Sequence, residues 1–125
     1  MTVGLGVDLV ETARIRDSLE KFGDRFKNRI YGPREQEYCD RMADPAIHYA
    51  GRFAAKEAVS KSFGTGIGKQ LGWLDIEIVR SEETGAPGIA LHGKGLELLK
   101  ARGASKVLVS LAHTKDHAVA TAALV

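Results

Sequence analysis

Residues 51 to 66 constrain the fold of this chain most, because they predict a helix that must pack closely against another element. The stretch reads Gly-Arg-Phe-Ala-Ala-Lys-Glu-Ala-Val-Ser-Lys-Ser-Phe-Gly-Thr-Gly. At about 100° per residue, one helix face carries only small side chains: Ala50, Ala54, Ala58 and Ser62. The other face, which we interpret as available for chemistry, carries Phe53, Lys56, Glu57, Ser60 and Lys61. The function then depends on which other residues meet Glu57 and Lys61.

The length and composition favour one folded unit, a single domain over residues 1–125. Hydrophobic residues make up 44% of the chain, and no apolar run approaches the ~18 residues that would predict a membrane-spanning helix. No secretory signal precedes the first strand-like segment, and the only cysteine, Cys39, has no partner for an intrachain disulfide. We therefore expect a cytoplasmic protein that does not bind membranes.

The segment from residue 3 to residue 10 is predicted to be a strand with two unlike faces. One face carries Val3, Leu5, Val7 and Leu9, and the other carries Gly4, Gly6, Asp8 and Val10. Glycines inside a strand often mark the close approach of a ligand or another backbone. A buried carboxylate is costly unless it is paired or bound to a metal. Asp8 is thus either part of such a site or a cap of the following helix, and spacing alone does not distinguish the two.

The remaining periodicity predicts a helical first half and a strand-rich second half. Helices are expected over residues 11–21, 24–30 and 34–42, followed by a central helix that begins after Asp44 as N-cap and ends near Gly64. Two hairpins are expected, one from residues 74–79 and 89–91 and one from residues 106–112 and 118–125, with a helix over residues 93–102 between them. This order predicts an α+β fold with helices packed on a small antiparallel sheet.

Four polar side chains stand in apolar or glycine-marked settings: Asp8, Glu57, Lys61 and His113. The two carboxylates have the chemistry to hold one Mg²⁺ together with waters and substrate phosphates. Glu57 and Lys61, four residues apart, are explained equally well as an ordinary ion pair on a helix surface, and His113 as an ordinary hydrogen-bonding residue. The chain has no zinc-ligand spacing, no nucleophile elbow and no P-loop.

Positive charge is concentrated between residues 14 and 34. This segment has seven basic and three acidic side chains, a net charge of +4, whereas the whole chain carries only +2. Two interpretations remain open. The segment is either a solvated helix face or a docking surface for an acidic partner.

Three stretches resemble the signatures of the holo-acyl-carrier-protein synthases, the short bacterial-type 4'-phosphopantetheinyl transferases. They are residues 6–11 with Arg14, residues 52–58 with Lys61 and the glycine-containing residues 64–66, and residues 110–114. The resemblance runs in order over nearly the whole chain. Two positions depart from the family pattern: Ala112 stands where a serine often precedes the histidine, which puts one ligand hydroxyl in doubt, and Ala86 stands where a lysine is common.

The resemblance implies transfer of the phosphopantetheine group of coenzyme A to a serine of an acyl carrier protein, in support of fatty acid biosynthesis. Asp8 and Glu57 would be the Mg²⁺ ligands, and Lys61 would stabilise charge on the phosphates during the reaction. The proton of the attacking serine would pass either to Glu57 or to a water held by the metal and Asp8, and the sequence does not decide between them.

The same resemblance implies binding sites for both substrates. The coenzyme A contacts would be Arg52, Lys61, Gly64, Thr65 and His113, with Arg52 and His113 at the 3'-phosphate. The small, acidic carrier protein would dock on the first helices at Arg14, Arg25, Phe26 and Arg29. Members of this family are homotrimers with active sites between subunits, so His113 would act across an interface from Glu57.

Two alternatives from other classes remain at this point. One is a different Mg²⁺-dependent transferase or hydrolase of nucleotide pyrophosphates, which Asp8 and Glu57 would also serve. The other is a basic nucleic-acid-binding module formed by residues 14 to 34. The second is disfavoured by the few aromatic residues, by the acids within the basic segment and by the lack of a known nucleic-acid motif, so we expect no nucleic-acid partner.

Overall fold

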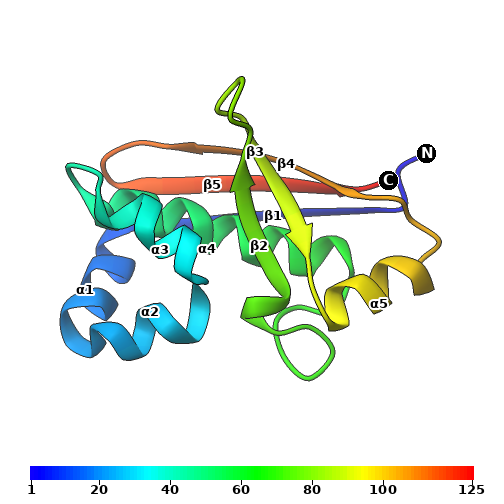
Figure 1. The fold of residues 1–125 in the computed structure, drawn as a ribbon, viewed down its shortest axis with the longest axis horizontal. Coiled ribbons are helices and arrows are strands. Elements are labelled where there is room, and N and C mark those ends of the chain that lie inside the picture. Colours follow the sequence, from blue (N-terminus) through cyan, green and yellow to red (C-terminus); the bar gives the residue numbers. More distant parts are fainter.

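The computed structural model describes residues 1–125, and its strands and helices follow one another in the expected order (Figure 1). The strands are β1 (Gly4–Glu11), β2 (Ile76–Arg80), β3 (Pro87–Leu91), β4 (Val107–His113) and β5 (His117–Leu124). The helices are α1 (Thr12–Phe22), α2 (Asp24–Ile30), α3 (Pro33–Asp40), α4 (Pro45–Ser62), α5 (Lys94–Ala101) and the short 3₁₀ turn η1 (Trp73–Asp75).

The strands form two antiparallel sheets. The larger has the order β1-β5-β4, with Asp8 paired to Ala120 in one ladder and His113 paired to Ala118 in the other. The smaller is the β2–β3 hairpin, in which Ile76 pairs with Leu91. The predicted α+β class and both predicted hairpins are confirmed, but the hairpins belong to two sheets instead of one.

Helix α4 is the central element of the fold. It lies along one face of the β1-β5-β4 sheet and also contacts α1, α3 and β2 (Figure 1). Most of its side chains are buried, and among its last six residues only Glu57 and Lys61 are not. The predicted small-residue face is confirmed, because Ala50, Ala54 and Ala58 are completely buried.

Two glycines let β1 approach α4 closely. A Cβ atom at Gly6 would overlap the carbonyl oxygen of Ala58, and one at Gly4 would overlap the carbonyl oxygen of Ser62. These positions therefore require glycine because of space, not because of an unusual φ angle. The expectation that the glycine face of this strand meets another backbone is confirmed, and the same face directs Asp8 toward α4.

Lys56 is fully buried and joins four parts of the fold. Its Nζ donates to Glu35 Oε1 at 2.8 Å, to the Ile30 carbonyl at 2.6 Å and to the Trp73 carbonyl at 3.2 Å. The other oxygen of Glu35 accepts the backbone N–H of Ile78 at 2.9 Å. Burial lowers the pKa of Lys56, and the charge of Glu35 opposes that shift.

The prediction that one face of the central helix is available for chemistry is therefore wrong in part. Lys56 makes a structural ion pair, and Ser60 is buried with its hydroxyl donating to the Glu57 carbonyl. Helical spacing placed these residues beside Glu57 but gave no sign that other elements cover that side of the helix. The first predicted hairpin strand also starts later than expected, at Ile76, because residues 73–75 form η1.

The second face of β1 is apolar and uncovered in the single chain. Leu5, Val7 and Leu9 are 74%, 56% and 66% exposed, and Leu108 of β4 and Val119 of β5 are also exposed. An apolar face of this kind is characteristic of a surface that contacts another protein. No helix of the chain combines the length and apolar character needed to cross a membrane.

Candidate functional site

Asp8 and Lys61 connect the first strand to the end of the central helix. The Lys61 ammonium donates to Asp8 Oδ1 and to the Val7 carbonyl oxygen, both at 3.0 Å. Helix α1 begins at Thr12 with Glu11 at its N-cap position, so Asp8 does not cap it. The capping interpretation of Asp8 is therefore wrong, and the interpretation as part of a charged site remains.

Glu57 lies one helical turn before Lys61 and is only partly exposed. Burial raises the pKa of Glu57, the charge of Asp8 raises it further, and Lys61 and Arg14 act in the opposite direction. The surface ion pair between Glu57 and Lys61 that spacing allowed is not formed, because Lys61 pairs with Asp8 instead. The structure thus brings Asp8, Glu57 and Lys61 into one cluster, the carboxylate cluster.

The carboxylate cluster suits a hard divalent cation such as Mg²⁺. Burial is the main cause of the raised pKa of Glu57, and repulsion by the Asp8 carboxylate adds to it; a bound cation would offset this repulsion. No group of three or more His, Cys, Asp or Glu side chains converges anywhere in the chain. Two carboxylates with the remaining positions filled by water and substrate phosphate form the usual protein environment of Mg²⁺.

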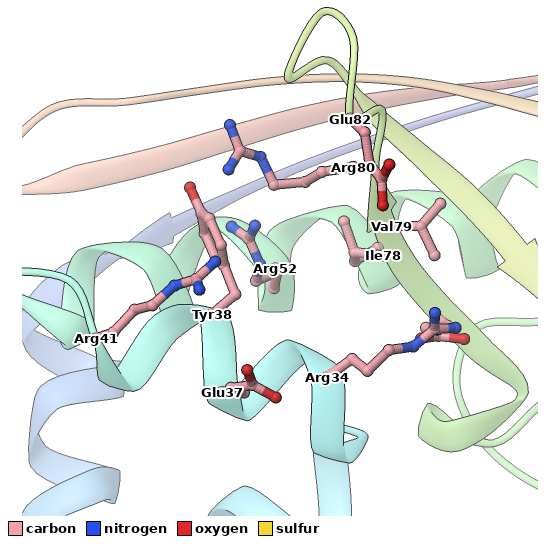
Figure 2. Close-up of a pocket in the computed structure, with 10 residues that line it drawn as sticks. Arg34, Glu37, Tyr38, Arg41, Arg52, Ile78, Val79, Arg80 and Glu82 are labelled. Atoms are coloured by element: carbon pink, nitrogen blue, oxygen red, sulfur yellow. The ribbon is translucent and has the colours of Figure 1, made fainter.

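A second cluster surrounds Tyr38, where α3, α4 and β2 meet (Figure 2). The Arg52 guanidinium lies 4.1 Å from the centroid of the Tyr38 ring, and those of Arg80 and Arg41 lie 4.5 and 5.7 Å from it. Arg52 is only 6% exposed, and its Nε has no hydrogen-bond partner. The three arginines form no salt bridge and line a cavity of about 400 Å³ together with acidic side chains, among them Glu37.

His113 joins this second cluster through His48. The two histidine rings are 5.3 Å apart at their centroids, and the His48 ring is 5.8 Å from that of Tyr38. Burial lowers the pKa of His48, and the charges of His113, Arg52 and Arg80 lower it further. We name residues 38, 41, 48, 52, 80 and 113 the arginine cluster. The part of this shift that Arg52 and Arg80 cause reflects the positive charge beside His48, which an anion site requires.

The carboxylate cluster and the arginine cluster do not meet within one chain. They contact α4 at Lys61 and His48, which are separated by roughly 20 Å of helix at 1.5 Å per residue. Arg52 and Lys61 are nine residues apart and therefore project from opposite sides of α4. A single chain consequently does not bring Arg52 or His113 to Glu57.

The loop at residues 64–66 ends α4. The backbone N–H of Gly64 donates to the Lys61 carbonyl, and those of Thr65 and Gly66 donate to the Ser60 carbonyl. The Thr65 hydroxyl donates to the Gly66 carbonyl. Since these donors are all used within the protein, the loop forms no preassembled phosphate cradle, and ligand binding by Gly64 and Thr65 stays a prediction.

The docking residues expected on the first helices differ in exposure. Arg14, Arg25 and Arg29 are exposed, with the Arg14 guanidinium 5.4 Å from the centroid of Phe53. Phe26 is instead partly buried against the core and makes an edge contact with Tyr31 at 6.0 Å. The Phe26 side chain, which was expected to contact a partner, thus packs partly within the fold.

Four members of the arginine cluster were not predicted from the sequence as site residues: Tyr38, Arg41, His48 and Arg80. They come from α3, the turn after it, α4 and β2, and they meet only because α3 and β2 both pack against α4. No motif links these segments. The only residue in the sequence that pointed to this cluster was Arg52, an arginine beside alanines in the central helix.

The chain is similar to known proteins in both sequence and fold. The profile of the 4'-phosphopantetheinyl transferase superfamily matches residues 4–122. A holo-[acyl-carrier-protein] synthase of Natranaerobius thermophilus is 47% identical over 124 residues, which are 99% of this chain and 98% of that relative. The crystal structure of the Neisseria meningitidis holo-[acyl-carrier-protein] synthase has a TM-score of 0.91 and 32% identity, covering 100% of this chain and 99% of that one.

A third relative has been crystallised with a ligand. The Helicobacter pylori holo-[acyl-carrier-protein] synthase in complex with coenzyme A has a TM-score of 0.85 and 33% identity, covering 97% of this chain and 99% of that one. The chain described here belongs to the 4'-phosphopantetheinyl transferase superfamily. Within that superfamily, the relatives to which it is similar along nearly their whole length are holo-[acyl-carrier-protein] synthases.

Proposed function

We propose that this protein is a holo-[acyl-carrier-protein] synthase, which transfers 4'-phosphopantetheine from coenzyme A to a serine of an apo-acyl carrier protein. The serine oxygen forms a new bond to the phosphorus that bears the pantetheine arm, the pyrophosphate bond breaks, and adenosine 3',5'-bisphosphate leaves. The carboxylate cluster is the observation that carries the proposal, since it supplies the groups such a transfer needs. The family match favours this reaction over hydrolysis of nucleotide pyrophosphates and over nucleic-acid binding.

Within the carboxylate cluster, each side chain has a separate role. Asp8 and Glu57 would hold Mg²⁺, which when bound neutralises charge on the pyrophosphate of coenzyme A. Lys61 holds Asp8 in position and places its ammonium beside the transferred phosphate, where it stabilises negative charge. The proton of the attacking serine would pass to Glu57 or to a water held by the metal and Asp8, because a bound cation would offset the repulsion that helps to raise the pKa of Glu57.

The arginine cluster would bind the 3'-phosphate end of coenzyme A. Arg52 has a buried guanidinium without a carboxylate partner, and Arg41 and Arg80 approach the same tyrosine ring. A phosphate would supply the anionic partner that these guanidiniums lack, because none of them forms a salt bridge. His113 belongs to the same cluster, consistent with the role that the resemblance implies for it.

A homotrimer with active sites between subunits accounts for two features of the single chain. The carboxylate and arginine clusters lie on opposite sides of α4, so a second copy is needed to place one opposite the other. The uncovered apolar side chains of β1 supply a surface for that contact. We further propose a cytoplasmic location and a role in fatty acid biosynthesis, in line with the buried free thiol of Cys39 and the lack of a membrane-spanning helix.

Mass spectrometry of the carrier protein tests the proposal. The protein would be incubated with coenzyme A, Mg²⁺ and an apo-acyl carrier protein, and the carrier should gain the mass of one phosphopantetheine group. Removal of divalent ions with a chelator should stop the gain, and added Mg²⁺ should restore it. No gain would refute the transferase, whereas an equal gain with chelator present would refute the metal's role alone.

A further inference from the structure

His48 joins Tyr38 to His113 within the arginine cluster. Its ring makes an edge contact with the Tyr38 ring of α3, with 5.8 Å between the centroids, and another with the His113 ring of β4, with 5.3 Å. Arg52 follows one helical turn later on α4, so its side chain projects from the same side of that helix as the partly buried His48. A phosphate bound between Arg52 and His113 would therefore lie next to the His48 ring.

The groups that surround His48 are mostly basic. They come from the elements packed around it and are Tyr38 of α3, Arg41 after α3, Arg52 of α4, Arg80 of β2, His113 of β4 and Asp44 before α4. Asp44 is the carboxylate among them, and both of its oxygens already accept hydrogen bonds from the Arg16 guanidinium at 2.9 Å. His48 therefore lacks a free carboxylate that would stabilise a proton on its ring.

Without a ligand, the His48 ring is neutral near pH 7. The ordinary pKa of a histidine is about 6.5. Burial lowers the pKa of His48, and the charges of His113, Arg52 and Arg80 lower it further. The charge of Asp44 acts in the opposite direction but is the weaker influence. A phosphate monoester carries a charge of about −1.5 to −2 near pH 7, and an anion within hydrogen-bonding reach favours the protonated form of a histidine.

We propose that His48 takes up a proton when a phosphate monoester occupies the arginine cluster, and that it then acts as a fourth cation beside Arg41, Arg52 and Arg80. The proton comes from the solvent, and no covalent bond between heavy atoms changes. This inference rests on the proposed function, which assigns the 3'-phosphate of coenzyme A to the arginine cluster. It follows that the protein should distinguish coenzyme A from dephospho-coenzyme A more strongly at about pH 6.5 than at about pH 8, a range in which the phosphate is mostly a dianion.

Nuclear magnetic resonance of the histidine ring nitrogens tests the inference directly. The ¹⁵N-labelled full chain would be titrated between about pH 5 and pH 8.5 in three states: alone, saturated with coenzyme A, and saturated with dephospho-coenzyme A, which lacks only the 3'-phosphate. Without carrier protein no transfer takes place during the measurement. Coenzyme A should raise the pKa of His48 by about one unit, the effect of a close opposite charge, and dephospho-coenzyme A should leave it unchanged.

His117 is the internal control for this titration. It begins β5 and is exposed, next to the buried Ala118 that pairs with His113. Because side chains alternate along a strand, His117 projects from the opposite face of the sheet to His113. Its pKa should be the same with either ligand.

Calorimetry with His48→Phe identifies the proton acceptor. Phenylalanine keeps an aromatic ring against Tyr38 and His113 but holds no proton. The unmodified protein should take up protons on binding coenzyme A near pH 7, measured in two buffers of different ionisation enthalpy. Its affinity should increase about two- to threefold from pH 8 to pH 6.5, as follows from a rise of one pKa unit. Both effects should be lost in His48→Phe.

The outcomes separate this inference from the proposed function. If neither ligand binds, or if both bind equally well, the 3'-phosphate site of the proposed function is refuted and this inference with it. If the 3'-phosphate strengthens binding while the pKa of His48 stays the same, the inference alone is refuted. Proton uptake that persists in His48→Phe would also overturn it, because another group would then be the acceptor.

Discussion

At the scale of single residues, Lys61 determines how the carboxylate cluster is arranged. Its ammonium bonds both the side chain of Asp8 and the backbone of Val7, so it ties α4 to β1 at the point where the two carboxylates come together. Glu57 has no cation of its own, and its pKa is raised as a result of burial and of the charge on Asp8. Within the cluster, the charge of Asp8 is therefore paired with Lys61, whereas the charge of Glu57 forms no ion pair.

Asp8→Asn and Glu57→Gln should each reduce Mg²⁺-dependent transfer by at least about 10²-fold, the loss typical of removing one charge-stabilising group from an active site. Both changes preserve side-chain size, so far-ultraviolet circular dichroism should be unchanged. Glu97→Gln, an exposed carboxylate on α5, is the matched control and should be fully active. Unchanged turnover in either test variant would remove that residue from the site.

The sequence was informative about this cluster because local spacing carries the signal. Glycines beside Asp8 in a strand, and Glu57 and Lys61 one turn apart in a helix, are visible without knowledge of the fold. The arginine cluster was not predictable in the same way, because Tyr38 and Arg80 become neighbours of Arg52 only through tertiary packing. The buried pairing of Lys56 with Glu35 was missed for the same reason.

At the scale of elements, the contact between β1 and α4 depends on two missing side chains. Gly6→Ala should destabilise the protein by about 1–3 kcal/mol or more, because its Cβ overlaps the carbonyl oxygen of Ala58 and the helix must move. Gly68→Ala is the control, since Gly68 has open space around its Cβ position and no positive φ. Urea unfolding gives both values, and equal stability of the two variants would contradict the close approach described here.

The pairing of α1 with the start of α4 should depend on pH. The hydrogen bond from Arg16 lowers the pKa of Asp44, so the pair stabilises the fold when Asp44 is ionised and loses that effect as the pH falls through the lowered pKa. Asp44→Asn should therefore lower the Tm near pH 7, and the difference from the unmodified protein should narrow toward about pH 3. A difference that stays constant with pH would show that the ion pair contributes nothing.

The types and order of the regular elements were predictable from hydrophobic period and turn residues. The predicted helix at residues 24–30 matches α2 at both ends, and the predicted strands fall within a few residues of the observed ones. The division of the strands between two sheets was not predictable. Hydrophobic periodicity shows which residues of a strand share a face, but it does not show which strands pair with each other. The early turn at η1 was missed since residues 73–75 continue the alternation of the following strand.

At the scale of the whole molecule, the uncovered face of β1 predicts association. Light scattering should give a mass of about 40 kDa, three times the 13.5 kDa of one chain, for a protein with C₃ symmetry. Leu5→Asp should lower this mass toward that of the single chain, because it places a charge on the apolar face. Transfer activity should fall with it, since the arginine cluster would then lose the carboxylate cluster of its neighbour.

Thr2→Asp provides the control. Thr2 precedes β1, so this substitution adds the same charge as Leu5→Asp but outside the apolar face. It should leave the mass unchanged. A mass of one chain for the unmodified protein at the concentration of the activity assay would refute the trimer. Full activity in a monomeric Leu5→Asp variant would refute the sharing of sites between subunits.

The position of β5 has a consequence for how the chain is made. β5 lies between β1 and β4, and it is the only strand that pairs with β1. More than a hundred residues separate Gly4 from its partner Leu124. The carboxylate of Asp8 therefore leaves the ribosome long before β5 is synthesised, and its strand has no paired strand until then. Contacts of such long range form late, so the site should be completed after translation of the whole sheet and not during it.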